Sequence, residues 1–407
     1  MLPNLFITLF ACNNQPNQPE EECIDSSRPR EIEEEIVEVT NGDLPFAISL
    51  HNEAHAQNKN NAKNLVHSPY SISSALGMLH LGASGNTKIE LEVGLGIENE
   101  TVWHNSKGVI IQELHQPQRC DYQLAIANKL FAQQNMPFHS EFINNVDTIY
   151  GAPVQEVDFQ GNPEEGRIIV NDWVSEQTQA NIPELLAEGS ITNITRLILT
   201  NAIYMNAPWK QPFDPSDTRD FPFTTEDGQT IQVPTMIHEE MDIQRYDDEL
   251  ISVAKIPYEG DELSMSIYVP QEGVFLSDIE DSLDTEYLQT IQSNQYFETA
   301  LVNLPKFEIR SQLALKDTLI NMGMGSMFAG GLDNISDESL VVSSVVHEAW
   351  IKVEEKGTEA AAATAVVAEE TSMPAEIFLV NRSFLFTIQD DITGALLFMG
   401  RVDNPLE

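Results

Sequence analysis

Residues 353–368 read Val-Glu-Glu-Lys-Gly-Thr-Glu-Ala-Ala-Ala-Ala-Thr-Ala-Val-Val-Ala, and this stretch decides the interpretation of the chain. After Gly357 its side chains are all small or β-branched except for Glu359. Local propensity favours a helix, because Ala is the best helix former and Glu359 would lie in the first turn. The same residues also suit a strand, in which alternate side chains point to opposite faces.

As a strand, this stretch would have one face of small side chains, formed by Thr358, Ala360, Ala362, Thr364 and Val366. Such a face can enter an already packed sheet without overpacking it. The other face would hold Glu359 near the start and Glu369 near the end in water. A bulky or charged residue at Thr358 or Thr364 would block entry, and the sequence has neither. We therefore expect a segment that can join a sheet as an extra strand.

Helix and strand signals alternate through residues 41–407 without a low-complexity break or an internal repeat. Apolar residues at helical spacing follow Ser68-Pro69, a helix start signal. Apolar, β-rich runs predict strands at 196–205, 264–270, 301–307, 384–388 and 394–402. Because helices come early and strands late, we expect an α+β fold.

The stretch 353–368 resembles the hinge of serpins, a family of serine protease inhibitors, and other serpin-like motifs follow the family's order. They are Asn64-Leu-Val-His-Ser-Pro-Tyr-Ser-Ile, Thr200-Asn-Ala-Ile-Tyr-Met-Asn-Ala-Pro-Trp-Lys-Gln-Pro-Phe, Leu304-Pro-Lys-Phe, His347-Glu-Ala, Phe378-Leu-Val-Asn-Arg-Ser-Phe-Leu-Phe and Leu397-Phe-Met-Gly-Arg-Val-Asp-Asn-Pro. The resemblance, to a prokaryotic-type inhibitory serpin, implies about eight to nine helices around three β-sheets. It also implies an exposed reactive-centre loop at about 355–374.

The resemblance implies an irreversible suicide-substrate inhibitor. A target protease cleaves the exposed loop, and the loop inserts into the central sheet before the acyl-enzyme hydrolyses, which requires a metastable native state. Serpin loop insertion is itself an established example of strand addition and of strain release. The implied partner is a serine protease held in a covalent acyl complex, and cysteine proteases are a further target class because they also form an acyl-enzyme.

The hinge residues that the resemblance implies are Glu355, Gly357, Thr358, Ala360, Ala361, Ala362, Ala363 and Thr364. Gly357 suits a position where the chain turns sharply in one state and extends in the other. Five further residues match the place where serpin strands part to admit the loop: Ser68, Ser71, Asn201, His347 and Trp209. His347 suits an ordinary hydrogen-bonded core histidine equally well.

The family's spacing from Glu355 places the cleaved bond between Thr371 and Ser372. The neighbouring bonds, Glu370-Thr371 and Ser372-Met373, stay open. A small Thr suits an elastase-like or subtilisin-like protease, whereas Glu370 suits a glutamate-preferring one. The window has no Arg or Lys, which disfavours trypsin-like targets.

The formal charge of −43 argues against nucleic acid as a partner, because phosphate binding needs clusters of Lys and Arg. Only three cysteines are present, none in a Cys-x-x-Cys pair, so we expect no disulfide framework, no metal site and no cofactor. An apolar start that ends in Leu9-Phe10-Ala11-Cys12 resembles a bacterial lipoprotein leader, with Cys12 as the lipidated residue. An ordinary cleaved signal and a chance apolar start stay open, since positive residues are missing.

Residues 1–12 are thus read as a leader, 13–40 as an acidic disordered tether, and 41–407 as one serpin domain. We expect a monomer that is secreted or displayed at the cell surface as a lipid-anchored lipoprotein, with no other membrane contact.

The sequence gives less support to an enzyme than to an inhibitor. His51-Asn-Glu-Ala-His55 has Asn where zinc peptidases need Glu, so we expect a solvated helix face there. We find no Gly-x-Ser-x-Gly elbow for Ser-His-Asp catalysis. Within the family, the rivals are a protein cleaved as a plain substrate and a binding or storage protein. The intact hinge favours inhibition over both.

Overall fold

The central helix forms where the sequence supplies both a cap and a proline. In this computed structural model, which describes residues 33–58, 63–114, 121–358 and 376–407, α3 (Pro69–Gly82) begins after the N-cap Ser68. The Ser68 side chain accepts a hydrogen bond from the Ser71 backbone amide at 3.2 Å, and Pro69 lies in the first turn. The helix predicted after Ser68-Pro69 is therefore confirmed, and α3 is buried along almost its whole length.

The other α-helices among the described residues surround α3 or cover the sheets. They are α1 (Glu34–Gly42), α2 (Leu44–Asn58), α4 (Gly85–Leu95), α5 (Glu100–Leu114), α6 (Ser140–Tyr150), α7 (Pro163–Gln177), α8 (Leu276–Ser282), α9 (Thr285–Ser293) and α10 (Lys316–Asn321). Only Asp43 separates α1 from α2.

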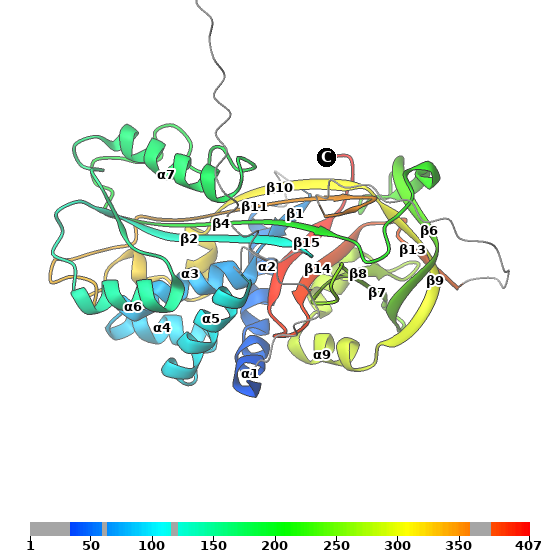
Figure 1. The fold of residues 1–407 in the computed structure, drawn as a ribbon, viewed down its shortest axis with the longest axis horizontal. Helices are drawn as coiled ribbons and strands as arrows, with labels where there is room; N and C mark the ends of the chain where they lie inside the picture. The colour runs from blue at the N-terminus through cyan, green and yellow to red at the C-terminus, as the bar shows by residue number, and fades with distance from the viewer. Residues whose placement is uncertain (1–32, 59–62, 115–120, 359–375) are drawn as a thin grey trace, which may run out of the picture.

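One six-stranded sheet runs along the molecule in the order β10-β11-β12-β4-β2-β3. These strands are β10 (Phe307–Ala314), β11 (Ser344–Glu354), β12 (Gly357–Thr358), β4 (Leu197–Pro208), β2 (Gln123–Gln133) and β3 (Gln155–Val157). Helices α3 to α6 lie on one face of this sheet and α7 lies on the other (Figure 1). The sheet is therefore buried on both faces over much of its length.

The second sheet has nine strands, in the order β1-β15-β14-β8-β7-β6-β9-β13, with β5 paired to β6. These strands are β1 (Leu65–His67), β15 (Leu396–Val402), β14 (Phe384–Asp390), β8 (Leu263–Pro270), β7 (Ile251–Pro257), β6 (Thr230–Asp247), β9 (Tyr296–Pro305), β13 (Glu376–Leu379) and β5 (Arg219–Thr224). The strands predicted at 196–205, 264–270, 384–388 and 394–402 are confirmed, whereas the run at 301–307 divides between the end of β9 at Pro305 and the start of β10 at Phe307.

The expected α+β fold is confirmed, although the described strands form two hydrogen-bonded sheets where three were expected. Strand β6 explains the difference. It is 18 residues long and shifts register between His238 and Met241. One end pairs with β5, the other with β7, and both halves pair with β9, so a single ladder joins what would otherwise be two sheets.

The predicted tether extends too far along the chain. Helix α1 begins at Glu34, and its residues Ile36 and Thr40 are buried against the domain. The structured part therefore starts before residue 41. An apolar residue at helical spacing helps to hold this short acidic helix in place, because it packs against α5.

The prediction of a solvated helix face around His51 is also wrong. His51 is fully buried, with Nδ1 3.1 Å from His67 Nε2 and Nε2 3.0 Å from the Glu280 carboxylate. Arg401 donates to the same carboxylate at 2.8 Å and contacts His55 at 2.6 Å. Helix α8 and strand β15, far away in sequence, cover this side of α2.

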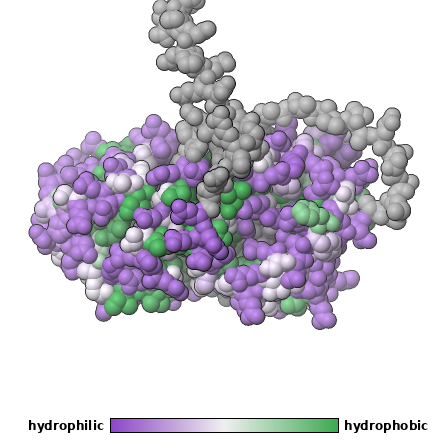
Figure 2. Space-filling view, turned by 60° about the horizontal axis from the view of Figure 1, so that its bottom comes forward, coloured by the Kyte–Doolittle hydropathy of each residue, from purple (hydrophilic) through white to green (hydrophobic). Residues whose placement is uncertain are grey.

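The face shown in Figure 2 is mainly hydrophilic, with small groups of hydrophobic residues between the polar ones. Over the residues that the structure describes, no helix combines the length and apolar character needed to cross a membrane.

Candidate strand-insertion site

Strands β4 and β11 pair directly over only part of their length. Residues 198–203 lie parallel to residues 344–349, and beyond that point the two strands part. Strand β12 occupies the gap at the far end and is antiparallel to both neighbours. The six-stranded sheet thus contains a seam that one short strand has already entered.

The short strand β12 consists of two of the predicted hinge residues. Thr358 lies opposite Val353 of β11 and Ala207 of β4, and Gly357 precedes it in the same two ladders. Gly357 and Thr358 therefore have strand conformation, which local helix propensity did not favour, while Glu355 lies in the turn before them. The hinge residues Ala360, Ala361, Ala362, Ala363 and Thr364 lie outside the described residues, as do Glu370, Thr371, Ser372, Met373 and Cys12.

Gly357 occupies a position that other residues cannot fill. Its φ is +151°, and a Cβ atom there would lie 2.2 Å from the Ala207 carbonyl oxygen and 2.6 Å from Pro208 Cα. Both atoms belong to the backbone of β4 and cannot move aside. Close approach of the two backbones therefore requires glycine.

Thr358 points into the core from the seam. It is 1% exposed, and its hydroxyl lies 2.7 Å from the Tyr258 hydroxyl, so the two groups share a hydrogen bond. Tyr258 is stacked on Trp209, with ring centroids 4.5 Å apart and planes at 6°. Burial raises the pKa of Tyr258, which keeps its hydroxyl protonated. Thr358 thus fills a small buried site next to two aromatic rings, and its hydroxyl has a hydrogen-bond partner there.

Trp209 also fixes the turn that connects β11 to β12. Its indole Nε1 donates to the Glu354 carbonyl at 3.0 Å, and its backbone amide donates to the Lys356 carbonyl at 2.9 Å. The Phe213 amide donates to the Glu355 carbonyl at 2.8 Å. Three consecutive carbonyls of the turn are therefore satisfied from the segment that follows β4.

The Glu355 side chain closes the same turn from outside. Its carboxylate accepts hydrogen bonds from Lys306 Nζ at 2.9 Å and from the Thr218 hydroxyl at 2.8 Å. Burial alone would raise the pKa of Glu355, but these contacts outweigh it and the pKa is lowered. Glu355 is therefore ionised and anchored at neutral pH.

A buried polar cluster closes the seam where β4 and β11 pair directly. His347 Nε2 accepts a hydrogen bond from the Ser68 backbone amide at 3.1 Å, so Nδ1 carries the proton and donates to Asn201 Oδ1 across the seam. Burial lowers the pKa of His347 to about 3. The imidazole is therefore neutral, and it joins the two strands to the start of α3.

The rest of the cluster continues from Asn201. Its amide donates to the Ser71 hydroxyl and to Asn128 Oδ1. Ser71 donates to Asn128 Oδ1 at 3.2 Å, and the Asn128 amide donates to the Ser71 carbonyl at 3.2 Å. Ser68, Ser71, Asn201 and His347 thus lie together, while Trp209 lies apart at the β12 end.

Two members of the site escaped the sequence analysis. Asn128 interrupts the apolar strand β2, and this lone amide was the available signal for a buried polar contact. Tyr258 follows β7 with no local feature that predicts its contact with Thr358. On the outer face of the sheet, Tyr204 and Trp350 stack across the seam at 6.5 Å just where β4 and β11 part.

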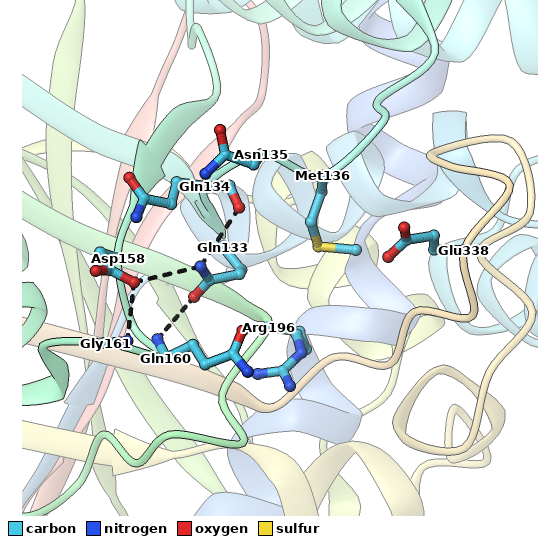
Figure 3. A pocket seen from close by; sticks show the side chains of 9 residues that line it. All are labelled: Gln133, Gln134, Asn135, Met136, Asp158, Gln160, Gly161, Arg196 and Glu338. Atoms are coloured by element: carbon cyan, nitrogen blue, oxygen red, sulfur yellow. Dashed lines mark hydrogen bonds between the residues drawn. The ribbon is translucent and has the colours of Figure 1, made fainter.

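A hollow of about 530 Å³ lies elsewhere, near the ends of β2 and β3 (Figure 3). Gln133 is held there by hydrogen bonds to Asp158 and to the Gln160 backbone amide, and Arg196 and Glu338 lie across from it. Its nine lining residues include no Ser, Cys or His that could act as a nucleophile or as an imidazole base. This hollow therefore gives no support to a hydrolase.

Comparison with known proteins identifies the architecture around the seam. The family model described as "Serpin (serine protease inhibitor)" matches residues 42–405. The leukocyte elastase inhibitor of Equus caballus is 35% identical over 354 residues, which cover 84% of this chain and 93% of that protein. An uncharacterized serpin-like protein of Thermococcus kodakarensis is 35% identical over 377 residues, covering 90% and 86% of the two chains.

Among solved structures, human thyroxine-binding globulin complexed with thyroxine matches with a TM-score of 0.83 and 27% identity. The alignment covers 92% of this chain and all of the other. The likeness therefore extends over the whole folded part, including both sheets and the seam.

Proposed function

Because this chain belongs to the serpin family of serine protease inhibitors, we propose that it is an irreversible suicide-substrate inhibitor of serine proteases. The observation that carries the proposal is β12. Two hinge residues already lie between β4 and β11, and beyond them the two strands pair directly only over residues 198–203 and 344–349. After cleavage of the loop, the rest of the hinge follows β12 into the seam and carries the acylated protease with it.

The observed register defines where each following residue would go. Continued from Thr358, it places Ala360 between Met205 and Ile351. It places Ala362 between Ile203 and Ala349. Small side chains at these core-facing positions can enter between existing neighbours without overpacking them.

The same register brings Thr364 between Asn201 and His347. These two residues form the hydrogen bond that closes the seam, so the polar cluster has to open at that point. A threonine hydroxyl can replace the lost partner of either residue. Polar groups that stay buried therefore remain satisfied on both sides of the inserted strand.

The length of the small-residue run supports the same conclusion. The run from Thr358 to Ala368 has as many residues as β4 from Ala207 to Leu197. Glu369, the next charged residue, falls beyond the end of β4 in this register. The run of small residues is thus as long as the part of β4 with which it would pair.

The outer face of the sheet also accepts the inserted strand. Glu359 would lie beside Lys352, a pairing of opposite charges. Ala361 would lie between Tyr204 and Trp350 and break the aromatic stack across the seam. Its methyl group needs little space between the two rings.

The energetics favour insertion. One short parallel ladder between β4 and β11 is replaced by two antiparallel ladders, a net gain of roughly a dozen hydrogen bonds. At about 1 kcal/mol each, they contribute on the order of 10 kcal/mol. The native state is then metastable, because the inserted state lies lower.

We place the cleaved bond at Thr371-Ser372 and the target among elastase-like or subtilisin-like proteases. A small residue before the cut suits a shallow specificity pocket. The relatives named leukocyte elastase inhibitors, from Equus caballus among others, support this class of target.

A binding role without inhibition is the second candidate. A solved relative is a globulin complexed with thyroxine, so the fold also serves in binding proteins. The seated Thr358 and the small residues after it favour inhibition, since a protein that never inserts its loop has no need of them.

The deciding experiment is incubation of the chain with elastase-like, subtilisin-like, glutamate-specific and trypsin-like proteases. We expect a covalent complex that survives boiling in detergent, and mass spectrometry of the released peptide to place the cut after Thr371. Cleavage by every protease without a trapped complex would refute inhibition and favour the binding or substrate role.

For the leader, we propose that Cys12 carries a lipid that anchors the protein at the cell surface, with an acidic tether before α1. Membrane fractions of expressing bacterial cells should contain the protein, and Cys12→Ala should release it. Equal distribution of both forms would refute the anchor.

A further inference from the structure

Two buried histidines face each other on the helical side of the molecule, away from the seam. His80 belongs to α3 and His104 to α5, and they are 1% and 3% exposed. His80 Nδ1 lies 2.9 Å from His104 Nε2. Glu100, one turn before His104 on α5, brings a carboxylate oxygen within 4.8 Å of a ring nitrogen of each histidine.

The outer nitrogen of each ring has its own partner. His80 Nε2 lies 3.5 Å from the Glu92 carboxylate of α4, and His104 Nδ1 lies 2.6 Å from the Tyr150 hydroxyl at the end of α6. Histidines that bind metals are oriented in this way, with the second ring nitrogen donating to a carboxylate or another oxygen. The inner nitrogens of the two rings thereby face each other.

We propose that His80, His104 and Glu100 bind a zinc ion, with water as the fourth ligand. Two imidazole nitrogens and one carboxylate form a ligand set that suits Zn²⁺. Zinc–nitrogen bonds of about 2.0–2.1 Å in a tetrahedron put two nitrogens about 3.3 Å apart, so the two rings have to separate slightly and tilt until both lone pairs point at the ion.

Binding of the ion requires one proton to move within the His104 ring. Without metal, His104 Nε2 carries the proton and donates it to His80 Nδ1; with the ion on Nε2, the ring proton resides on Nδ1 and bonds to the Tyr150 oxygen. The Nε2 lone pair is then available to the ion.

The ion can also reach the site. Glu100 is exposed, with 44% of its side chain accessible, and Glu92 is about one third accessible. Lys88 binds one Glu100 oxygen at 2.7 Å and leaves the other oxygen to turn toward the histidines. The two carboxylates thus form an acidic opening from solvent to the buried nitrogens.

The site connects separate helices. Bound zinc would bridge α3 to α5 directly, while Glu92 and Tyr150 extend the contact to α4 and α6. Because the ion binds the folded chain and the ligands come from different helices, it should raise the thermal stability of the protein in a concentration-dependent way.

The alternative is a hydrogen-bond chain without metal. Tyr150 would donate to His104, His104 Nε2 to His80, and His80 Nε2 to Glu92, so that every buried nitrogen is satisfied. This chain and the zinc site make different predictions for added metal.

The test uses the full chain without an affinity tag, stripped with a chelator. Zn²⁺ is titrated by calorimetry and followed by thermal unfolding, and Co²⁺ is added to detect tetrahedral absorption bands. We expect one ion per chain and a melting temperature that rises with Zn²⁺. Mg²⁺ should have no such effect, since it prefers oxygen ligands.

Variants distinguish Zn²⁺ binding at the proposed site from unspecific Zn²⁺ binding elsewhere on this acidic protein. Glu100→Gln changes an exposed side chain and should abolish the rise in melting temperature, as should His104→Gln. Glu92→Gln should weaken Zn²⁺ affinity roughly 10–100-fold, as expected for a partner of a ligand. His139→Gln, at a partly exposed histidine paired with Asp337, is the matched control and should bind like the wild type.

Should the wild type show no stoichiometric Zn²⁺ binding, or Glu100→Gln bind as tightly as His139→Gln, the hydrogen-bond chain is the correct description. Because His104 is buried, His104→Gln could fail to fold, which its melting temperature in chelator reveals. Glu100→Gln still decides the outcome.

Discussion

Thr358→Arg should convert the inhibitor into a substrate. Thr358 is buried at the start of the seam, on the core side, next to the stacked Trp209 and Tyr258. Arginine cannot be accommodated there without placing its charge against two aromatic rings and the hydrophobic core. In the intact protein the loop can withdraw these two residues into solvent, so the fold should survive.

The magnitude follows from the burial of the charge. Insertion would force the guanidinium into the closed sheet, and a buried unpaired ion costs several kcal/mol. A penalty of about 4 kcal/mol slows insertion roughly a thousandfold. Hydrolysis of the acyl-enzyme then occurs before the protease is carried away. Cleavage itself should proceed at an unchanged rate, since Thr371 lies far along the loop.

The assay measures how many inhibitor molecules are consumed per protease molecule inactivated, together with the detergent-resistant complex on a gel. Wild type should inactivate the protease with few molecules consumed, whereas Thr358→Arg should be cleaved without complex. Glu359→Arg is the control, because in the same register this side chain would lie on the outer face beside Lys352, where repulsion between hydrated charges costs under about 1 kcal/mol, so most of the inhibition should be retained. Thr358→Val should also retain most of it.

Two results would refute this reasoning. A boiling-resistant complex formed by Thr358→Arg at wild-type efficiency would mean that the loop does not enter the seam. Equal loss of inhibition in Thr358→Arg and Glu359→Arg would mean that charge near the hinge matters but that the two-residue alternation does not.

Three further predictions concern the same region. Gly357→Val should unseat β12, because the valine side chain would meet the β4 backbone. Hydrogen exchange at the Ala207 backbone amide should then become at least tenfold faster. Unchanged protection of this amide would contradict the close approach of the two backbones. Lower pH should destabilise the fold, because His347 stays neutral down to a pKa of about 3 when folded but takes up a proton below about 6.5 when unfolded. The free energy of unfolding should then fall by up to about 1.4 kcal/mol for each pH unit between pH 6.5 and 3, and His104 should add a similar pH dependence. Urea unfolding measured from pH 5 to 7.5 checks this, because His347→Gln should make the free energy of unfolding less dependent on pH. Thr371→Arg should trap trypsin in a covalent complex, and cleavage at another bond by mass spectrometry would correct the assigned site.

The sequence predicted the elements of the site better than their contacts. The small face that begins at Thr358 follows from residue size and alternation, and the structure places Thr358 toward the core. Ser68 and Pro69 predicted the start of α3 because caps are local. The grouping of Asn201 with His347 came from the family resemblance, since a parallel pairing between distant strands leaves no local signal.

The errors have one common cause, which is contact between segments distant in the chain. His51 and His55 stand one turn apart on a helix with polar residues on several sides, and nothing nearby shows that α8 and β15 cover them. Likewise, the acidic segment before residue 41 looked too polar to fold, but α1 buries Ile36 and Thr40, and the Thr40 hydroxyl donates to the distant Thr393 carbonyl. Asn128 and Tyr258 were missed for the same reason.

The seated strand β12 also decides which chain can fill the seam. Any segment with small residues at alternate positions fits between β4 and β11, including the loop of a second molecule. The molecule's own loop has a kinetic advantage, because two of its residues are already paired and the next ones are held at an effective concentration in the millimolar range or above. Weakening the anchors at Glu355 and Trp209 would remove that advantage. We therefore expect linking between copies of the protein to increase when this two-residue strand is unseated.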